Sequence, residues 1–179
     1  MLDIDRLIAE CRAAVAADQG GTRALREVVA RAVADPAAVL AALGEPMKSG
    51  IWPLYHGQDV TVINLVWAPN MMIMPHDHHM AAVIGIYTGR EDNIFWRRRP
   101  DDARRIEAAG ARSLCQRDVT VLGRDIIHSV VNPIGRLTGA IHVYAGDFFR
   151  VERSEWDPEE LSERPYDVAK ARQMFAGAA

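Results

Sequence analysis

Four histidines in apolar surroundings are the residues of this sequence best suited to binding a metal ion. His76 and His78 lie two positions apart within residues 74–89, so on an extended strand both side chains would point to the same face. Two neutral imidazoles that converge on one point form half of a transition-metal site, although such a pair is also common at protein surfaces. His128 and His142 lie in two further apolar runs. A shared metal would give buried histidines the polar partner that they need.

The composition argues against nucleic acid and membranes as partners. The chain has 179 residues, enough for one domain with a substantial core, and its net charge of −3 provides no general attraction for nucleic acid. No apolar run is long enough to span a membrane, and the acidic start of the chain does not resemble a secretory signal. Cys11 and Cys115 show no framework spacing, so we expect reduced thiols and a cytoplasmic protein.

The first quarter of the chain has the periodicity of short helices. Apolar residues recur at helical spacing over residues 4–17, and the glycine pair at 20–21 would end this helix. Thr22 can cap a second helix. The Asp-Pro pair at 35–36 is a typical helix start, and Gly44 would end this third helix. The apolar stripes of these helices predict a packing surface.

From about residue 51 the pattern changes to short runs of β-branched and aromatic residues, which are typical of strands. We expect strands within residues 60–67, 81–87, 93–97, 112–115, 118–122, 126–131 and 137–144. Short strands separated by turns predict an all-β sandwich or barrel. The stretch 101–111 fits either a loop or a helical turn, residues 157–160 fit a helix start, and residues 168–175 fit a C-terminal helix.

Two sequence motifs surround the first three of these histidines. The first is Pro-His-Asp-His at 75–78, followed by Gly89, and the second is His128 with Asn132 four positions later. With these motifs the chain resembles the cupin superfamily, and within it the cysteine dioxygenase-like thiol dioxygenases. The resemblance implies an all-β core, a cupin double-stranded β-helix barrel with N-terminal helices and a short C-terminal helix. It divides the chain into an N-terminal helical extension, a cupin barrel and a C-terminal extension, at residues 1–50, 51–150 and 151–179.

The resemblance implies three histidine ligands and no carboxylate. Many cupins add a glutamate, but Ala82 or Val83 stands at that position here. The implied ligands of Fe(II) are His76, His78 and His128, which would leave open positions for a small-molecule thiol and O2. The implied activity is the oxidation of the thiol to its sulfinate. Two alternatives stay open, namely a three-histidine cupin that cleaves a carbon–carbon bond of a β-diketone-like substrate, and a non-catalytic cupin that binds a metal or a small molecule.

The family also has a Ser-x-His-x-Tyr motif beyond the third ligand, which here reads Ala140-x-His142-x-Tyr144. The resemblance makes Tyr144 and His142 the catalytic pair, with the phenol donating a hydrogen bond into the metal site and His142 fixing its direction. Because the serine is replaced by alanine, we expect a relay that is one link shorter. Without the resemblance, both residues fit ordinary positions in a strand core.

Two departures from the family bear on the substrate. Animal-type cysteine dioxygenase has a cysteine cross-linked to the tyrosine, and the corresponding stretch 81–83 contains none. That enzyme also holds the substrate carboxylate with an upstream arginine, and the comparable stretch here offers only His56. Arg90 and Arg124 are alternative candidates for this role. We therefore expect cysteine to be a poor substrate and a thiol such as a mercapto-acid to be a better one.

Overall fold

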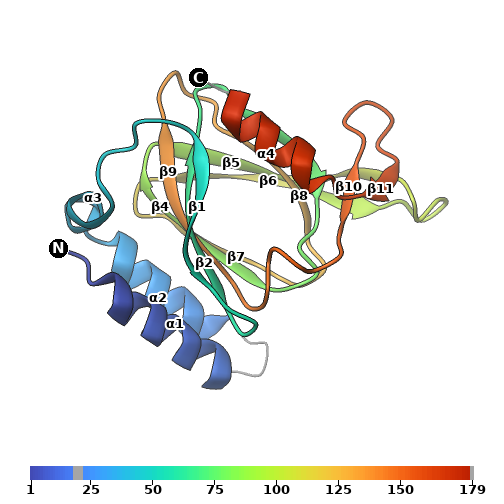
Figure 1. The fold of residues 1–179 in the computed structure, drawn as a ribbon. Helices are drawn as coiled ribbons and strands as arrows, with labels where there is room; N and C mark the ends of the chain where they lie inside the picture. Colours follow the sequence, from blue (N-terminus) through green and yellow to red (C-terminus); the bar gives the residue numbers. More distant parts are fainter. Residues whose placement is uncertain (18–21, 178–179) are drawn as a thin grey trace.

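The computed structural model describes residues 1–17 and 22–177, and its core consists of two facing antiparallel sheets (Figure 1). The strands are β1 (Gly50–His56), β2 (Thr61–Trp67), β3 (Met72–His76), β4 (Ala82–Thr88), β5 (Arg90–Arg98), β6 (Ile106–Cys115), β7 (Val119–Leu122), β8 (Ile127–Val131), β9 (Thr138–Tyr144), β10 (Ser154–Trp156) and β11 (Glu163–Pro165). One sheet has the order β1-β2-β9-β4-β7 and the other the order β11-β10-β3-β8-β5-β6.

The strand order identifies the fold. Strands β2 to β9 pass back and forth between the sheets, except that β5 and β6 follow each other within one sheet. They have the order β2-β9-β4-β7 in one sheet and β3-β8-β5-β6 in the other. This is the order of two interlocked Greek keys, the jelly roll or double-stranded β-helix to which cupins belong. The predicted cupin fold is therefore confirmed, and the proposed boundaries at residues 50 and 150 stay a prediction.

Four helices accompany the sheets. They are α1 (Ile4–Ala17), α2 (Arg23–Val33), α3 (Pro36–Leu43) and α4 (Val168–Gly177). Asp35 caps α3 by accepting a hydrogen bond from the amide of Ala38, and Gly44 follows with a φ of 81°, as the sequence predicts. Thr22 stands at the N-cap of α2, but its side chain makes no capping hydrogen bond. The predicted stop at 20–21 lies outside the described residues. None of the described helices is long and apolar enough to span a membrane.

Two segments differ from the sequence predictions. Residues 106–111, expected as a loop or helical turn, form the first part of β6, because the whole of β5 pairs with that strand. Residues 157–160 do not start a helix. The Asp157 carboxylate accepts the amides of Glu159 and Glu160, as at a helix start, but the chain then returns as β11 and pairs with β10.

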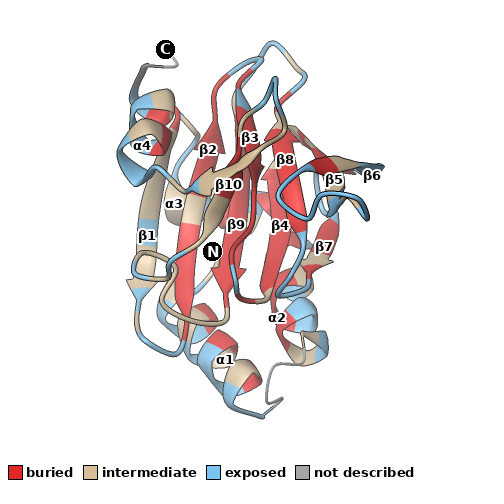
Figure 2. Ribbon diagram, turned by 90° about the vertical axis from the view of Figure 1, so that its right-hand side faces the viewer, coloured by how far each residue is buried: buried red, intermediate tan, exposed pale blue. Residues whose placement is uncertain are grey.

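The interior has two apolar layers. One fills the space between the sheets, and the other lies where α1 and α2 cover the outer face of the first sheet (Figures 1 and 2). Strands β4 and β9, which run through the middle of that sheet, are almost entirely buried because apolar side chains cover both faces. These two strands therefore form a rigid support for any side chain that points into the interior.

The contact between α2 and β4 depends on Gly85, and we expect Gly85→Ala to destabilise the protein. A Cβ atom there would lie 2.6 Å from Cγ1 of Val29 and 2.9 Å from Cγ1 of Val33, and β-branched side chains in a helix adjust poorly. Overpacking of this kind lowers the free energy of unfolding by about 1–3 kcal/mol. Urea unfolding measures this change in the free energy of unfolding. Gly110→Ala in β6 is the control, since no heavy atom lies within 4 Å of a Cβ built there. Equal stability of the two variants would contradict the expected packing.

Candidate metal centre

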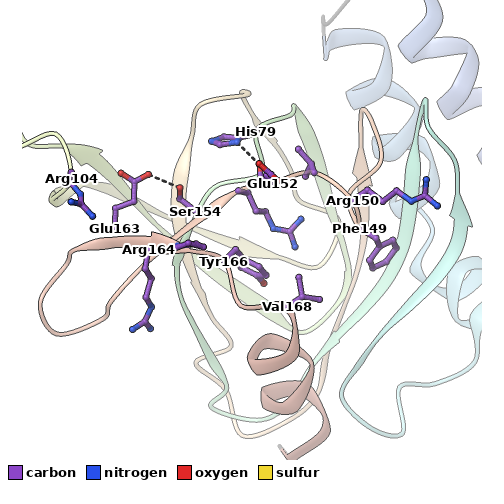
Figure 3. Close-up of a pocket in the computed structure, with 13 residues that line it drawn as sticks. His79, Arg104, Phe149, Arg150, Glu152, Ser154, Glu163, Arg164, Tyr166 and Val168 are labelled. Carbon is purple, nitrogen blue, oxygen red and sulfur yellow. Dashed lines mark hydrogen bonds between the residues drawn. The ribbon is translucent and has the colours of Figure 1, made fainter.

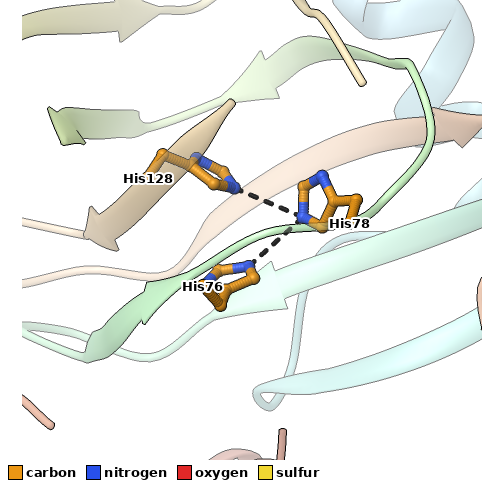
Figure 4. Close-up of side chains that lie close together, drawn as sticks. All are labelled: His76, His78 and His128. Atoms are coloured by element: carbon orange, nitrogen blue, oxygen red, sulfur yellow. Dashed lines mark hydrogen bonds between the residues drawn. The ribbon is translucent and has the colours of Figure 1, made fainter. Parts of the chain in front are cut away.

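Three histidine rings converge between the sheets (Figure 4). Nε2 of His78 lies 3.2 Å from Nε2 of His76 and 3.3 Å from Nε2 of His128. All three side chains are buried, and together they form a group that could hold one metal ion. His76 ends β3 and lies opposite His128 of β8 in the antiparallel register. His78 lies two residues beyond His76, in the irregular segment just after the end of β3, and its ring points to the same place as that of His76.

The hydrogen bonds of the outer ring nitrogens leave lone pairs facing the centre. Nδ1 of His76 lies 2.9 Å from the carbonyl oxygen of Met74, which can only accept, so this nitrogen carries the proton. Nδ1 of His128 lies 2.7 Å from Oδ1 of Asn93, which likewise accepts. In a neutral imidazole only one nitrogen is protonated. Nε2 of both rings is therefore free to bind a cation.

The surroundings keep the three rings neutral at pH 7. Burial lowers the pKa of His76 to about 4, and the charge of Arg153 adds a smaller effect in the same direction. Burial also lowers the pKa of His78 and His128 well below the usual value, and repulsion from the other rings adds to it. A divalent cation therefore meets three uncharged donors without displacing protons.

The spacing of the donors fits a divalent transition metal. With metal–imidazole bonds of about 2.0–2.1 Å, two donors lie about 2.9 Å apart in an octahedral arrangement and about 3.3 Å apart in a tetrahedral one. The separations of 3.2 and 3.3 Å fall within this range. Within the described residues the group contains no carboxylate. Imidazole donors of this kind suit iron, zinc, copper and nickel.

A small cavity of about 30 Å³ adjoins the three histidines. Tyr144 and His142 of β9 line it, so the structure brings all five predicted site residues together. The Tyr144 hydroxyl lies 3.2 Å from Nδ1 of His142, and its ring stands edge-on to that of His78 with centroids 5.0 Å apart. Burial raises the pKa of Tyr144 far above its usual range, so the phenol keeps its proton. Ala82 lies opposite Tyr144 in the register, which leaves no thiol there for a cross-link.

Arg153, which the sequence analysis did not identify, supplies positive charge beside this cavity. Its guanidinium lies over the rings of Phe148 and Tyr166, 4.1 and 4.2 Å from their centroids, and both rings line the cavity. The same charge lowers the pKa of His76 and of His78. Nη1 of Arg153 donates to the carbonyl oxygen of Phe148 at 2.6 Å, whereas its Nε is buried and has no hydrogen-bond partner among the described residues. No strand or helix pattern in the sequence could have identified Arg153, because this residue lies in an irregular segment after β9.

The loop that carries His78 also holds the Arg153 segment in place. Asp77 accepts a hydrogen bond from the amide of Ser154 at 2.9 Å, and Nδ1 of His79 lies 2.8 Å from the carbonyl oxygen of Glu152. These contacts fix the backbone on both sides of Arg153. Figure 3 shows His79 and Glu152 at the rim of an open cleft of about 900 Å³, which Tyr166 and Arg153 also line. Tyr166 and Arg153 thus separate the metal cavity from this outer cleft.

The three carboxylate-binding candidates named from the sequence do not line the cavity, and Arg153 itself lies behind two of its lining rings and lines only the outer cleft. Arg90 is held by Asp92 and Ser113 at the edge of the second sheet. Arg124 is exposed, and His56 pairs with Asp147 at 2.7 Å.

Glu91 lies behind His142 but does not extend the relay. Its Oε2 is 3.4 Å from Nε2 of His142 and the carboxyl group is fully buried, but among the described residues Nε2 of His142 has no hydrogen-bond partner. The expected shorter relay therefore stays a prediction. The sequence analysis did not identify Glu91, because it lies in a different strand, β5, with no sequence relation to His142.

Comparison with known proteins adds structural similarity only. No family model matches the chain, and no curated protein matches its sequence. Among solved structures, an RmlC-like cupin family protein with a double-stranded β-helix fold from Methanocaldococcus jannaschii is 9% identical, with a TM-score of 0.48 over 59% of this chain and 87% of the other. A cupin 2 conserved barrel domain protein from Leptotrichia buccalis is 12% identical, with a TM-score of 0.44 over 56% and 42%. Oxalate oxidase in complex with the substrate analogue glycolate is 14% identical, with a TM-score of 0.43 over 57% and 53%.

Proposed function

We propose that this protein binds one Fe(II) ion and uses O2 to oxidise a small thiol with an anionic group to its sulfinate. The observation that carries the proposal is a group of three neutral histidines without a carboxylate, beside a buried phenol. Three uncharged ligands leave the full charge of the ion to attract a thiolate. The resemblance of the motifs to thiol dioxygenases supports the same assignment. Among the metals that suit imidazole, iron is the one that this resemblance favours.

The chemistry that a bound Fe(II) ion supplies is the ionisation of a coordinated thiol and the activation of O2. His76, His78 and His128 would hold the ion on one side. The reaction is RS⁻ + O2 → RSO2⁻, in which two S–O bonds form, the O–O bond breaks, sulfur loses four electrons and O2 gains them. If the substrate arrives as a thiol, its proton is released to the solvent.

The chain's own residues would orient the reactants. The Tyr144 hydroxyl would donate a hydrogen bond to oxygen atoms on the substrate side of the cavity, and His142 would hold the phenol in place. Arg153 would bind the anionic group of the substrate. A cavity of about 30 Å³ holds roughly one water molecule. We therefore expect Phe148 and Tyr166 to shift when the substrate enters.

The β-diketone alternative is less consistent with this site. Such a substrate would need a larger apolar pocket without a neighbouring cation. The cavity is small, and the guanidinium of Arg153 lies against two of its lining rings. A small anionic thiol suits both features better.

The test is to supply iron-loaded protein with 3-mercaptopropionate, cysteine, cysteamine and a β-diketone, and to follow O2 uptake and products. We expect sulfinate from the mercapto-acid and little from cysteine or cysteamine. Diketone cleavage without thiol oxidation would move the assignment to a carbon–carbon-cleaving cupin. Inactivity on every substrate, with iron confirmed as bound, would make the protein a binding cupin.

Arg153→Gln is expected to weaken the use of an anionic thiol and to spare a cationic one. A hydrogen bond to a charged group contributes about 1.5–3 kcal/mol, so kcat/KM for 3-mercaptopropionate should fall by about 10- to 150-fold. Activity with cysteamine should not fall. Steady-state O2 uptake measures both. Arg150→Gln is the matched control, since Arg150 is 79% exposed and lines only the outer cleft. An equal loss for both substrates would remove Arg153 from substrate binding.

A further inference from the structure

We infer that Glu91 is a positioning residue that, through Asn93, sets the direction of the hydrogen bond to the metal ligand His128. The inference rests on the three-histidine site of the proposed function, but it does not depend on thiol oxidation. Glu91 lies in β5, is fully buried, and does not belong to the metal-binding group. A buried carboxylate is costly unless N–H groups and positive charge surround it, so its presence in the core calls for a function.

The contacts of Glu91 make it an acceptor on both oxygens. Oε2 accepts the indole N–H of Trp67 at 2.8 Å, and Oε1 accepts the side-chain amide of Asn93 at 2.9 Å. Among the described residues, His142 is the only basic side chain within 4 Å of this carboxylate, with Nε2 at 3.4 Å from Oε2. Trp67 and Asn93 therefore each present an N–H to the carboxyl group of Glu91.

One consequence reaches the metal ligand His128. Because the NH2 group of Asn93 faces Glu91, the carbonyl oxygen of Asn93 faces Nδ1 of His128, 2.7 Å away. Nδ1 of His128 then carries the proton, and Nε2 presents its lone pair to the metal. Glu91 thus fixes the tautomer of His128 through Asn93.

Glu91 also lies near the other side of the site. Nε2 of His142 is 3.4 Å from Oε2 of Glu91, but among the described residues this nitrogen has no hydrogen-bond partner. The orienting effect of Glu91 therefore reaches the site through Asn93 and His128. An acceptor behind Nδ1 raises the basicity of a ligating histidine.

Glu91→Gln tests the inference because it changes few atoms and reverses one hydrogen bond. A carboxamide offers one acceptor and one NH2 group in place of two acceptors. If its oxygen keeps the contact with Trp67, its NH2 group faces Asn93, and the Asn93 amide must turn over. Asn93 then donates to Nδ1 of His128, and the ring proton moves to Nε2, which is the ligand atom. The opposite orientation would place the new NH2 group against the indole N–H of Trp67, so we expect the first.

The measurement is the dissociation constant of Zn²⁺, obtained by competition with a chelator. Loss of an outer partner of a metal ligand costs about 10- to 100-fold in affinity, and we expect a loss in this range for Glu91→Gln. The double variant Glu91→Gln/Asn93→Asp should recover most of it, because the carboxylate at position 93 accepts both the new NH2 group and the His128 proton. Glu107→Gln is the control, since this exposed glutamate pairs with Arg97 on the surface, and its affinity should not change.

The outcomes separate this inference from the proposed function. A loss in the single variant with recovery in the double variant supports the inference whether or not thiols are oxidised. Unchanged affinity in Glu91→Gln, or an equal loss in both variants, overturns it. Failure of the original protein to bind Zn²⁺ overturns both the inference and the metal site. If Glu91→Gln does not fold, Asn93→Leu should lose affinity in the same range, because it removes the acceptor for Nδ1 of His128. Unchanged affinity in that variant would also overturn the inference.

Discussion

Replacing any one of His76, His78 and His128 by alanine is expected to abolish stoichiometric metal binding. Each ring supplies one of the three Nε2 atoms that converge within the site, and no described carboxylate can take the place of a lost ligand. Two remaining imidazoles form an incomplete site. Removal of a hydrogen-bond partner behind a metal ligand lowers the metal affinity by about 10- to 100-fold. Removal of a ligand itself should lower the affinity by more than this. The proposed dioxygenase activity should disappear with the metal.

Metal analysis after dialysis measures the effect, and thermal unfolding provides a second readout. A ligand at 100 times its dissociation constant stabilises the folded state by about 2.7 kcal/mol, which corresponds to a rise in Tm of about 5–10 °C for a protein of this size. The original protein should show this rise on addition of metal, and the three variants should not. His56→Ala is the matched control, because His56 is 41% exposed and pairs with Asp147 away from the site. Retention of metal by any ligand variant would contradict the three-histidine assignment.

Tyr144→Phe is expected to slow turnover by on the order of 100-fold while metal binding stays nearly intact. The substitution removes only the hydroxyl group of a residue that lines the buried cavity. Electrostatic contacts are strong in such a site, because water is excluded. The ring remains stacked on Phe148, with centroids 4.0 Å apart, so the packing should persist. The loss should therefore fall on kcat more than on KM, and single-turnover measurements can separate the two.

Tyr87→Phe is the control for this experiment. Tyr87 is also a buried tyrosine, and its hydroxyl donates to Asn64 at 2.9 Å, but it belongs to the apolar layer under the helices. Loss of the Tyr87 hydroxyl should lower the free energy of unfolding by about 1 kcal/mol and leave turnover unchanged. If Tyr144→Phe retained full activity, Tyr144 would be a core residue and the phenol would have no part in the reaction.

Several features of this protein follow from local sequence. The cap of α3 is one, because Asp35 contacts an amide only three residues away. The buried strand β4 is another, since an uncharged run bounded by Gly89 has few alternatives to a fully covered strand. Four candidate histidines could be identified because histidines are rare in such apolar runs, and their chemistry restricts what they can do there. The resemblance of the motifs to cupins then selected three of them as ligands.

Tertiary structure decided the features that depend on contacts between distant segments. The turn at Asp157 has the hydrogen bonds of a helix start, but the chain forms a β10–β11 hairpin, fastened by the ion pair of Arg98 with Glu163. Arg98 and Glu163 are 65 residues apart in the sequence, so the residue pattern around either one does not reveal their pairing. The sequence likewise predicts His78 on a strand, whereas in the structure His78 lies in the irregular segment just beyond β3.

The electrostatics of the site were also decided by tertiary structure. Arg153 and Glu91 carry ordinary charges on segments far from the histidines in sequence, and either fits a solvated surface equally well. Their effect arises from burial, since a charge acts strongly on its neighbours only where water is excluded. The sequence alone determined which residues can bind the metal. The packing of β5, β9 and the segment after β9 decided which charges orient those residues, because only the folded chain brings these segments together.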